Sequence, residues 1–98
     1  MAGITPGPGG GNSAFNVSTT TVIKASPGTL YRICVITPPT ANGAAYDSAT
    51  TGGIAATNEI VPITTAMTAG TVIDVTWPCL SGITVNPGTS GVVSVSFL

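Results

Sequence analysis

The side chains of this chain that could carry acid–base chemistry are three carboxylates, Asp47, Glu59 and Asp74, because the sequence contains no histidine. A general acid or base must be held against the reacting proton, and catalytic carboxylates owe their shifted pKa values to specific neighbours. Asp74 alternates with apolar residues, whereas Asp47 and Glu59 lie in loop-like sequence rich in Ala, Thr and Gly. We therefore interpret all three as solvated or turn-capping carboxylates.

Nucleophilic, metal-binding and phosphate-binding sites are also not supported. A serine nucleophile needs an adjacent base, and Lys24 and Ser26 are close in sequence but are separated by a strand end and a proline turn. Two cysteines without histidine do not complete a four-ligand zinc site within one chain. The glycines between positions 7 and 11 lack the preceding strand and following helix of a phosphate loop. We expect no catalytic residue, no metal and no cofactor, and we predict that the protein is not an enzyme.

The two cysteines, Cys34 and Cys79, could form a disulfide or remain free. In the chain-entropy model, a bridge that closes the loop between them would stabilise the fold by roughly 4 kcal/mol. Against a bridge, the strand alternation places Cys34 on the face opposite Ile33 and Val35, whereas Cys79 continues the parity of Trp77. We favour two free buried thiols that pack as small apolar groups. This agrees with assembly in a reducing cytoplasm.

Charged residues make up 5% of the chain, compared with about 25% in an ordinary globular domain. A surface so poor in charge promotes association, and the cores of protein interfaces are depleted in charge. We therefore expect neighbouring protein chains to cover much of the surface, as in a homo-oligomer. Nucleic acid is a poor partner, because the chain has two basic residues and a net charge of −1. A membrane is excluded as a partner, because no apolar run approaches the ~18 residues of a spanning helix.

From residue 14 onwards the sequence is typical of β-structure, since Thr, Val and Ile are frequent and Pro and Gly recur between the extended segments. We predict an all-β fold, an antiparallel β-sandwich or flattened barrel of jelly-roll type, as a single domain over residues 14–98. The expected strands are Phe15–Lys24, Thr29–Thr37, Ile54–Ile63 (broken), Thr71–Trp77, Ile83–Val85 and Val92–Leu98, with a short one near Ala45–Asp47. Pro-Gly pairs at Pro27-Gly28 and Pro87-Gly88 predict type II turns.

The alternation along these strands predicts the core. The segment Thr29–Thr37 is apolar on both faces, so we expect it to be central and buried on both sides. Trp77 has two interpretations, a core residue at a strand end or an anchor in an interface. The residues expected to be mostly buried are Ile33, Val35, Ile73, Val75, Trp77, Val93, Val95 and Phe97.

Residues 1–13 form a Gly/Pro-rich segment in which neither a helix nor an internal strand is expected. We predict an extended arm that runs over a neighbouring chain. Ile4 is its one sizeable apolar anchor, and Pro6 and Pro8 reduce the entropy lost on ordering. The alternative is a tail that rests on its own domain. The expected interface residues are Ile4, Pro6, Pro8, Phe15 and Trp77.

Several strand-and-turn patterns are familiar. They are the run from Lys24 to Tyr31 (KASPGTLY), Tyr46-Asp47, Trp77-Pro78-Cys79, Gly82-Ile83 and Gly91-Val92-Val93. Over residues 17–98 the chain resembles small virion proteins of tailed bacteriophages, a group that carries no catalytic residues to transfer.

The resemblance implies a capsid decoration or cement protein, often a homotrimer. It would sit on the capsid exterior of the virion, be assembled in the host cytoplasm, and have the major capsid protein or other virion subunits as partners. The alternative is a receptor- or carbohydrate-binding module of a phage tail fibre or tail spike. Such a module should expose aromatic residues at one loop end, whereas most aromatics here fall in predicted strands.

Overall fold

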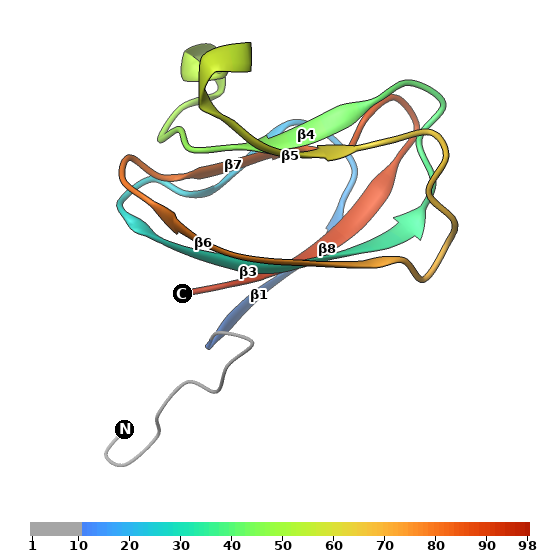
Figure 1. Ribbon diagram of the computed structural model, residues 1–98, viewed down its shortest axis with the longest axis horizontal. Coiled ribbons are helices and arrows are strands. Elements are labelled where there is room, and N and C mark those ends of the chain that lie inside the picture. The colour runs from blue at the N-terminus through green and yellow to red at the C-terminus, as the bar shows by residue number, and fades with distance from the viewer. Residues whose placement is uncertain (1–10) are drawn as a thin grey trace.

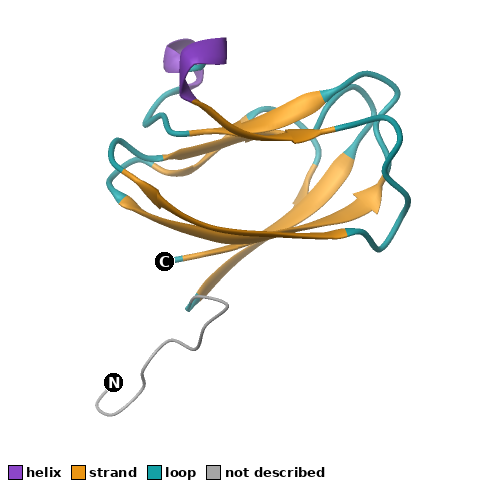
Figure 2. Ribbon diagram, viewed as in Figure 1, coloured by secondary structure: helices purple, strands orange, loops and turns teal. Residues whose placement is uncertain are grey.

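A computed structural model of the chain describes residues 11–98, and these residues form an all-β fold, as predicted. Two short 3-10 helices, η1 (Thr51–Gly53) and η2 (Ala56–Asn58), lie between the fourth and fifth strands, at one corner of the molecule (Figure 2). The described strands are β1 (Asn12–Val17), β2 (Thr21–Lys24), β3 (Gly28–Thr37), β4 (Gly43–Tyr46), β5 (Glu59–Ile63), β6 (Val72–Cys79), β7 (Ile83–Asn86) and β8 (Val92–Phe97).

The strands form two four-stranded antiparallel sheets that pack face to face (Figure 1). The strand order is β1-β8-β3-β6 in one sheet and β2-β7-β4-β5 in the other. The first strand therefore pairs with the last, the second with the seventh, the third with the sixth and the fourth with the fifth. This is a long hairpin rolled into two layers, the jelly-roll topology. The β-sandwich prediction is confirmed.

The predicted strand boundaries differ from the structure in two places. The expected strand Ile54–Ile63 begins only at Glu59, because Ala56–Asn58 form the 3-10 helix η2. The expected strand Phe15–Lys24 is two strands in opposite sheets, since the chain turns after Val17 and crosses from one layer to the other. A hydrogen bond of 2.8 Å from the Thr21 hydroxyl to the Thr19 carbonyl helps to form this crossing. Strand β1 begins at Asn12, two residues before the predicted start of the domain. Residues 1–10, which include Ile4, Pro6 and Pro8, lie outside the described residues.

Strand β3 is central, with β8 on one side and β6 on the other, but it is not buried on both faces. Leu30, Ile33 and Val35 are fully buried between the sheets, whereas Arg32 and Ile36 are exposed. A bulge between Leu30 and Arg32 changes the alternation, so that Leu30 and Ile33 both face the core. The prediction of two buried faces was wrong, because no element among residues 11–98 packs on the outer side of this sheet.

The predicted core is confirmed in its centre and corrected at its edge. Ile33, Val35, Val93 and Val95 are buried, and Ile73, Val75 and Phe97 are partly buried against them. Trp77 is 51% exposed and does not belong to this cluster. It lies on β6, which is an edge strand of its sheet, so neighbouring strands surround it on one side alone. The interpretation of Trp77 as a core residue was wrong.

The two Pro-Gly turns differ. Gly88 has φ +88°, and its N–H donates to the Asn86 side chain over 2.9 Å, as the turn chemistry predicts. Gly28 is instead the first residue of β3 and has no left-handed φ. A side chain at Gly28 would overlap the backbone of Leu98, so close strand packing is the reason for glycine there.

Gly43 gives a test of the packing of β4 against the turn after β7. A Cβ atom at Gly43 would overlap backbone atoms of Asn86 and Gly88, and backbone atoms cannot yield as a flexible side chain can. We expect Gly43→Ala to lower the free energy of unfolding by about 2–3 kcal/mol. The control, Gly52→Ala, adds a methyl group into open space and should change it by less than about 0.5 kcal/mol. Equal effects in urea denaturation would contradict this packing.

Candidate docking surfaces

The three carboxylates have separate structural settings. Asp74 accepts a hydrogen bond of 2.6 Å from the Arg32 Nε, in an ion pair whose side chains are 48% (Arg32) and 73% (Asp74) exposed. Glu59 is exposed at the start of β5. Asp47 accepts hydrogen bonds from three backbone N–H groups. Within residues 11–98 no group of three His, Cys, Asp or Glu side chains is placed to hold a metal ion.

Asp47 clamps the turn between β6 and β7. Its carboxylate accepts from the N–H groups of Leu80 (2.9 Å), Ser81 (2.8 Å) and Gly82 (3.4 Å). Desolvation by itself would raise the pKa of Asp47, but the three hydrogen bonds outweigh it and hold the pKa below its usual value of 3.8. The arrangement matches the predicted turn-capping carboxylate. Its effect is to fix the backbone that presents Leu80.

Both cysteines are free, as we favoured, and they lie in different environments. Cys79 is buried in the core, and Cys34 is partly exposed on the outer side of its sheet, so the expectation that both would be buried holds for Cys79 alone. Burial and, second, the negative charge of Asp47 raise the pKa of the Cys79 thiol to about 11. Cys79 is therefore protonated at neutral pH, and its role is packing.

A first group of exposed apolar residues, which we name the Trp77 end, consists of Trp77, Pro78 and Leu80, which are close together in the chain around the end of β6. Trp77 is 51% and Leu80 80% exposed, and Pro78 is also exposed. Leu80 lies in the turn that Asp47 clamps, so a large apolar side chain is held in solvent on a fixed backbone. Exposed Trp and Leu side chains on rigid backbone are the features of an interface anchor. This favours the second of the two interpretations of Trp77.

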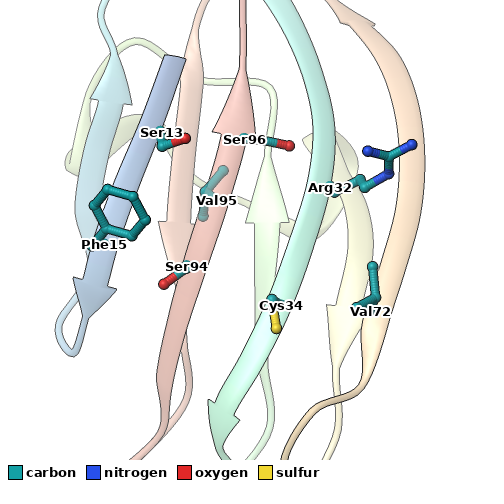
Figure 3. Close-up of a pocket in the computed structure, with 8 residues that line it drawn as sticks. All are labelled: Ser13, Phe15, Arg32, Cys34, Val72, Ser94, Val95 and Ser96. Carbon is teal, nitrogen blue, oxygen red and sulfur yellow. The ribbon is translucent and has the colours of Figure 1, made fainter. Parts of the chain in front are cut away.

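The second exposed apolar surface is the outer face of the β1-β8-β3-β6 sheet, which we name the outer face. A groove of about 250 Å³ lies on it, and Figure 3 shows its lining side chains on four strands. Strand register arranges the face in two rows. The apolar row contains Val72, Cys34, Ser94 and Phe15, in the order β6, β3, β8 and β1. The polar row contains Asp74, Arg32, Ser96 and Ser13 in the same order.

Phe15, one of the expected interface residues, is 75% exposed on this face. It lies in a bulge of β1 between Ala14 and Val17, where Asn16 has φ +52°. The bulge keeps Ala14 and Val17 against the core while Phe15 points outward (Figure 3). Sequence reasoning did not select Val72 or Cys34 as surface residues, although Val72 shares the parity of Asp74, and Cys34 that of Arg32. Only the pairing of β3 with β6 shows that these residues lie on the same face.

The Asp47 clamp predicts a pH dependence of stability. Because folding lowers the pKa of Asp47, its stabilisation is fully present above the unfolded-state pKa and is lost as the pH falls through the folded-state pKa. We expect Asp47→Asn to cost about 1–2 kcal/mol near neutral pH, because an amide group replaces one carboxylate oxygen facing the N–H donors. The difference should narrow as the pH falls below about 4. Urea denaturation at several pH values measures this difference in the free energy of unfolding, with Glu59→Gln as an exposed control. If the difference between the wild type and Asp47→Asn did not depend on pH, the clamp would be contradicted.

Trp77 and its cross-strand neighbour Leu30 give a matched pair for the exposed and the buried environment. Full burial would make Trp77→Ala cost about 3–5 kcal/mol. Because Trp77 is half exposed, we expect a loss of about 1 kcal/mol or less in the free energy of unfolding, whereas Leu30→Ala should cost about 2–5 kcal/mol. If Trp77→Ala lowered the free energy of unfolding as much as Leu30→Ala does, Trp77 would have to be a core residue.

Comparison with known proteins adds no relative on which to base a function. No family model, no curated protein and no solved structure matches the chain. No helix among the described residues is long and apolar enough to cross a membrane. The function therefore has to be argued from the fold and from the two exposed apolar surfaces.

Proposed function

We propose that this chain is a structural virion protein that decorates and cements a bacteriophage capsid through protein–protein contacts. The observation that carries the proposal is the combination of a surface with very few charges and large apolar side chains held in solvent at two separate places, the Trp77 end and the outer face. A free monomer gains nothing from such a surface, whereas an assembled subunit buries it.

Two separate surfaces suit a cementing role, because a cement must contact at least two neighbours at once. Each contact can be weak, since a second contact made by an already attached subunit is effectively intramolecular. Trp77 and Pro78 lie near the end of β6, and Leu80 lies in the turn from β6 to β7, which is at one end of the sandwich (Figure 1). The outer face instead covers the side of one sheet (Figure 3). One copy could therefore bind a shell subunit by one surface and a neighbouring subunit by the other.

The topology is consistent with the proposal by analogy at the level of fold. Double-sheet jelly rolls form viral capsid and lectin domains, among others, and the fold alone does not specify a function. The stronger argument comes from the surface. The partners we propose are the major capsid protein or other virion subunits and further copies of this chain, with a trimer as the form that the resemblance implies. The location is the capsid exterior.

The arm belongs to the same proposal. Ile4, Pro6 and Pro8 precede β1 in the chain. Strand β1 begins at Asn12 and is the edge strand next to β8. Ten residues of extended chain reach at most about 33–36 Å, which is enough to cross the face of a neighbouring domain of this size. We propose that the arm binds over an adjacent subunit through Ile4.

A receptor- or carbohydrate-binding module of a tail fibre is the second candidate, and the half-exposed Trp77 favours it. An indole ring in solvent can stack on a sugar ring, but sugar recognition also needs polar side chains that converge beside the ring. The other exposed residues of the Trp77 end are the apolar Pro78 and Leu80. A protein partner therefore fits the Trp77 end better than a carbohydrate does.

The test is attachment of the chain to particles of the phage that encodes it. Quantitative mass spectrometry should find many copies per particle, whereas a fibre module would be present in few. The double variant Trp77→Ser with Leu80→Ser should bind at least about 10-fold more weakly, because an interface anchor contributes 2 kcal/mol or more. Deletion of residues 2–10, which leaves β1 intact, should also weaken attachment.

The control is Ala56→Ser, an exposed change on η2, a helix that contributes no residue to either surface; this variant should attach like the wild type. Circular dichroism should show that all these variants retain the β fold. If the wild-type chain is absent from particles, or if the Trp77 and Leu80 double variant attaches as tightly as the wild type, the proposal is wrong. If the double variant attaches weakly but the arm deletion attaches like the wild type, the arm is a passive tail.

A further inference from the structure

We infer that the outer face is a self-association surface, on which two copies of this chain pack with their β1-β8-β3-β6 sheets face to face about a two-fold axis parallel to the strands. The inference deepens the proposed function, since it names the partner of one of the two exposed surfaces. It rests on the pattern of the face rather than on its exposure alone. The two-fold contact is separate from any three-fold association of the same chain.

Each row of the outer face is complementary to the same row of a second copy whose strand order is reversed. A two-fold axis that runs along the strands, between β3 and β8, places β3 opposite the partner's β8 and β6 opposite the partner's β1. In the apolar row Phe15 then faces the partner's Val72, and Cys34 faces the partner's Ser94. The two most exposed apolar side chains of the groove, Phe15 at 75% and Val72 at 54%, therefore bury each other, twice in each dimer.

The polar row specifies the same axis through its charges. Under this rotation Arg32 lies opposite the partner's Ser96 and Asp74 lies opposite the partner's Ser13, so neither charge lies opposite a like charge. The Arg32 guanidinium donates its Nε–H to Asp74 and still carries terminal N–H donors. A two-fold axis perpendicular to the strands at this row would instead place Arg32 against itself and Asp74 against itself, which is unfavourable.

The size of the face predicts a weak dimer. Four strands at about 4.8 Å spacing, over about six residues at 3.3 Å each, cover roughly 400 Å² per copy, or about 800 Å² in total. Stable interfaces bury about 1,200–2,000 Å², so free copies should pair with a Kd of roughly 10 µM to 1 mM. Copies held side by side on a common surface would pair far more completely, because their effective concentration is in the millimolar range.

Cys34 provides a native probe of this geometry. Sheets packed face to face lie about 10 Å apart, which places the two Cys34 Cα atoms about 11 Å from each other across the axis. This distance is too long for a disulfide but within reach of a short bismaleimide. The wild-type chain at about 0.5 mM should give a covalent dimer with this reagent, and Cys34→Ser should give none, since the Cys79 thiol is buried and its pKa is about 11.

Paired charge substitutions test the register, because Phe15 and Val72 are exposed and can be changed without loss of the core. Phe15→Lys combined with Val72→Asp places opposite charges across the axis, so sedimentation equilibrium should show a dimer within about 3-fold of the wild-type Kd. Phe15→Lys combined with Val72→Lys places like charges there and should weaken the dimer at least about 10-fold. Circular dichroism should show the β fold in both.

The outcomes separate this inference from the proposed function. A wild-type chain that stays monomeric at 1 mM without cross-linking, or two double variants that behave alike, would overturn the pairing, whereas loss of particle attachment by the Trp77 and Leu80 variant would still support the proposed function. A dimer with the expected charge dependence, in a chain that does not attach to particles, would support the pairing and reject the proposed function.

Discussion

The structure depends on one constraint, that two four-stranded layers bury only the sides that face each other. A chain of this length has enough apolar residues for the core between the sheets, which includes Leu30, Ile33, Val35, Ile83 and Val85. No third layer covers the outer side of the β1-β8-β3-β6 sheet within residues 11–98. The apolar side chains that remain on that side are therefore in solvent until another molecule covers them.

The chain has few charged residues, and three of them make specific contacts with nearby groups. Asp47 holds the β6–β7 turn through three backbone N–H groups, and Arg32 and Asp74 pair across two neighbouring strands on the outer face. The clamp fixes the backbone that presents Leu80, and the ion pair places charge beside an apolar groove. Such an exposed ion pair contributes little to stability. Its value lies in orientation, because charges specify how two apolar faces can meet.

The irregularities of the strands also determine the surface. Bulges in β1 and β3 change which residues face the core, and the edge strands contain Pro62 in β5 and Pro78 in β6. Proline and bulges at sheet edges discourage further strand pairing. The faces and the end of the sandwich are therefore better suited to contacts with partners than its edges are. This supports docking through side chains, as the Trp77 end and the outer face would provide.

The amino-acid sequence by itself determined the all-β class, most strand positions and the centre of the core, because alternation and β-branched residues act over a few neighbours. It could not determine that Phe15–Lys24 divides between two sheets, that β3 has an open face, or that Trp77 is half exposed. Those features depend on which distant strands pair, since an edge strand and a central strand can have the same pattern. The outer face likewise exists only after β1, β8, β3 and β6 pair, because its two rows take residues from four segments that are far apart in the chain.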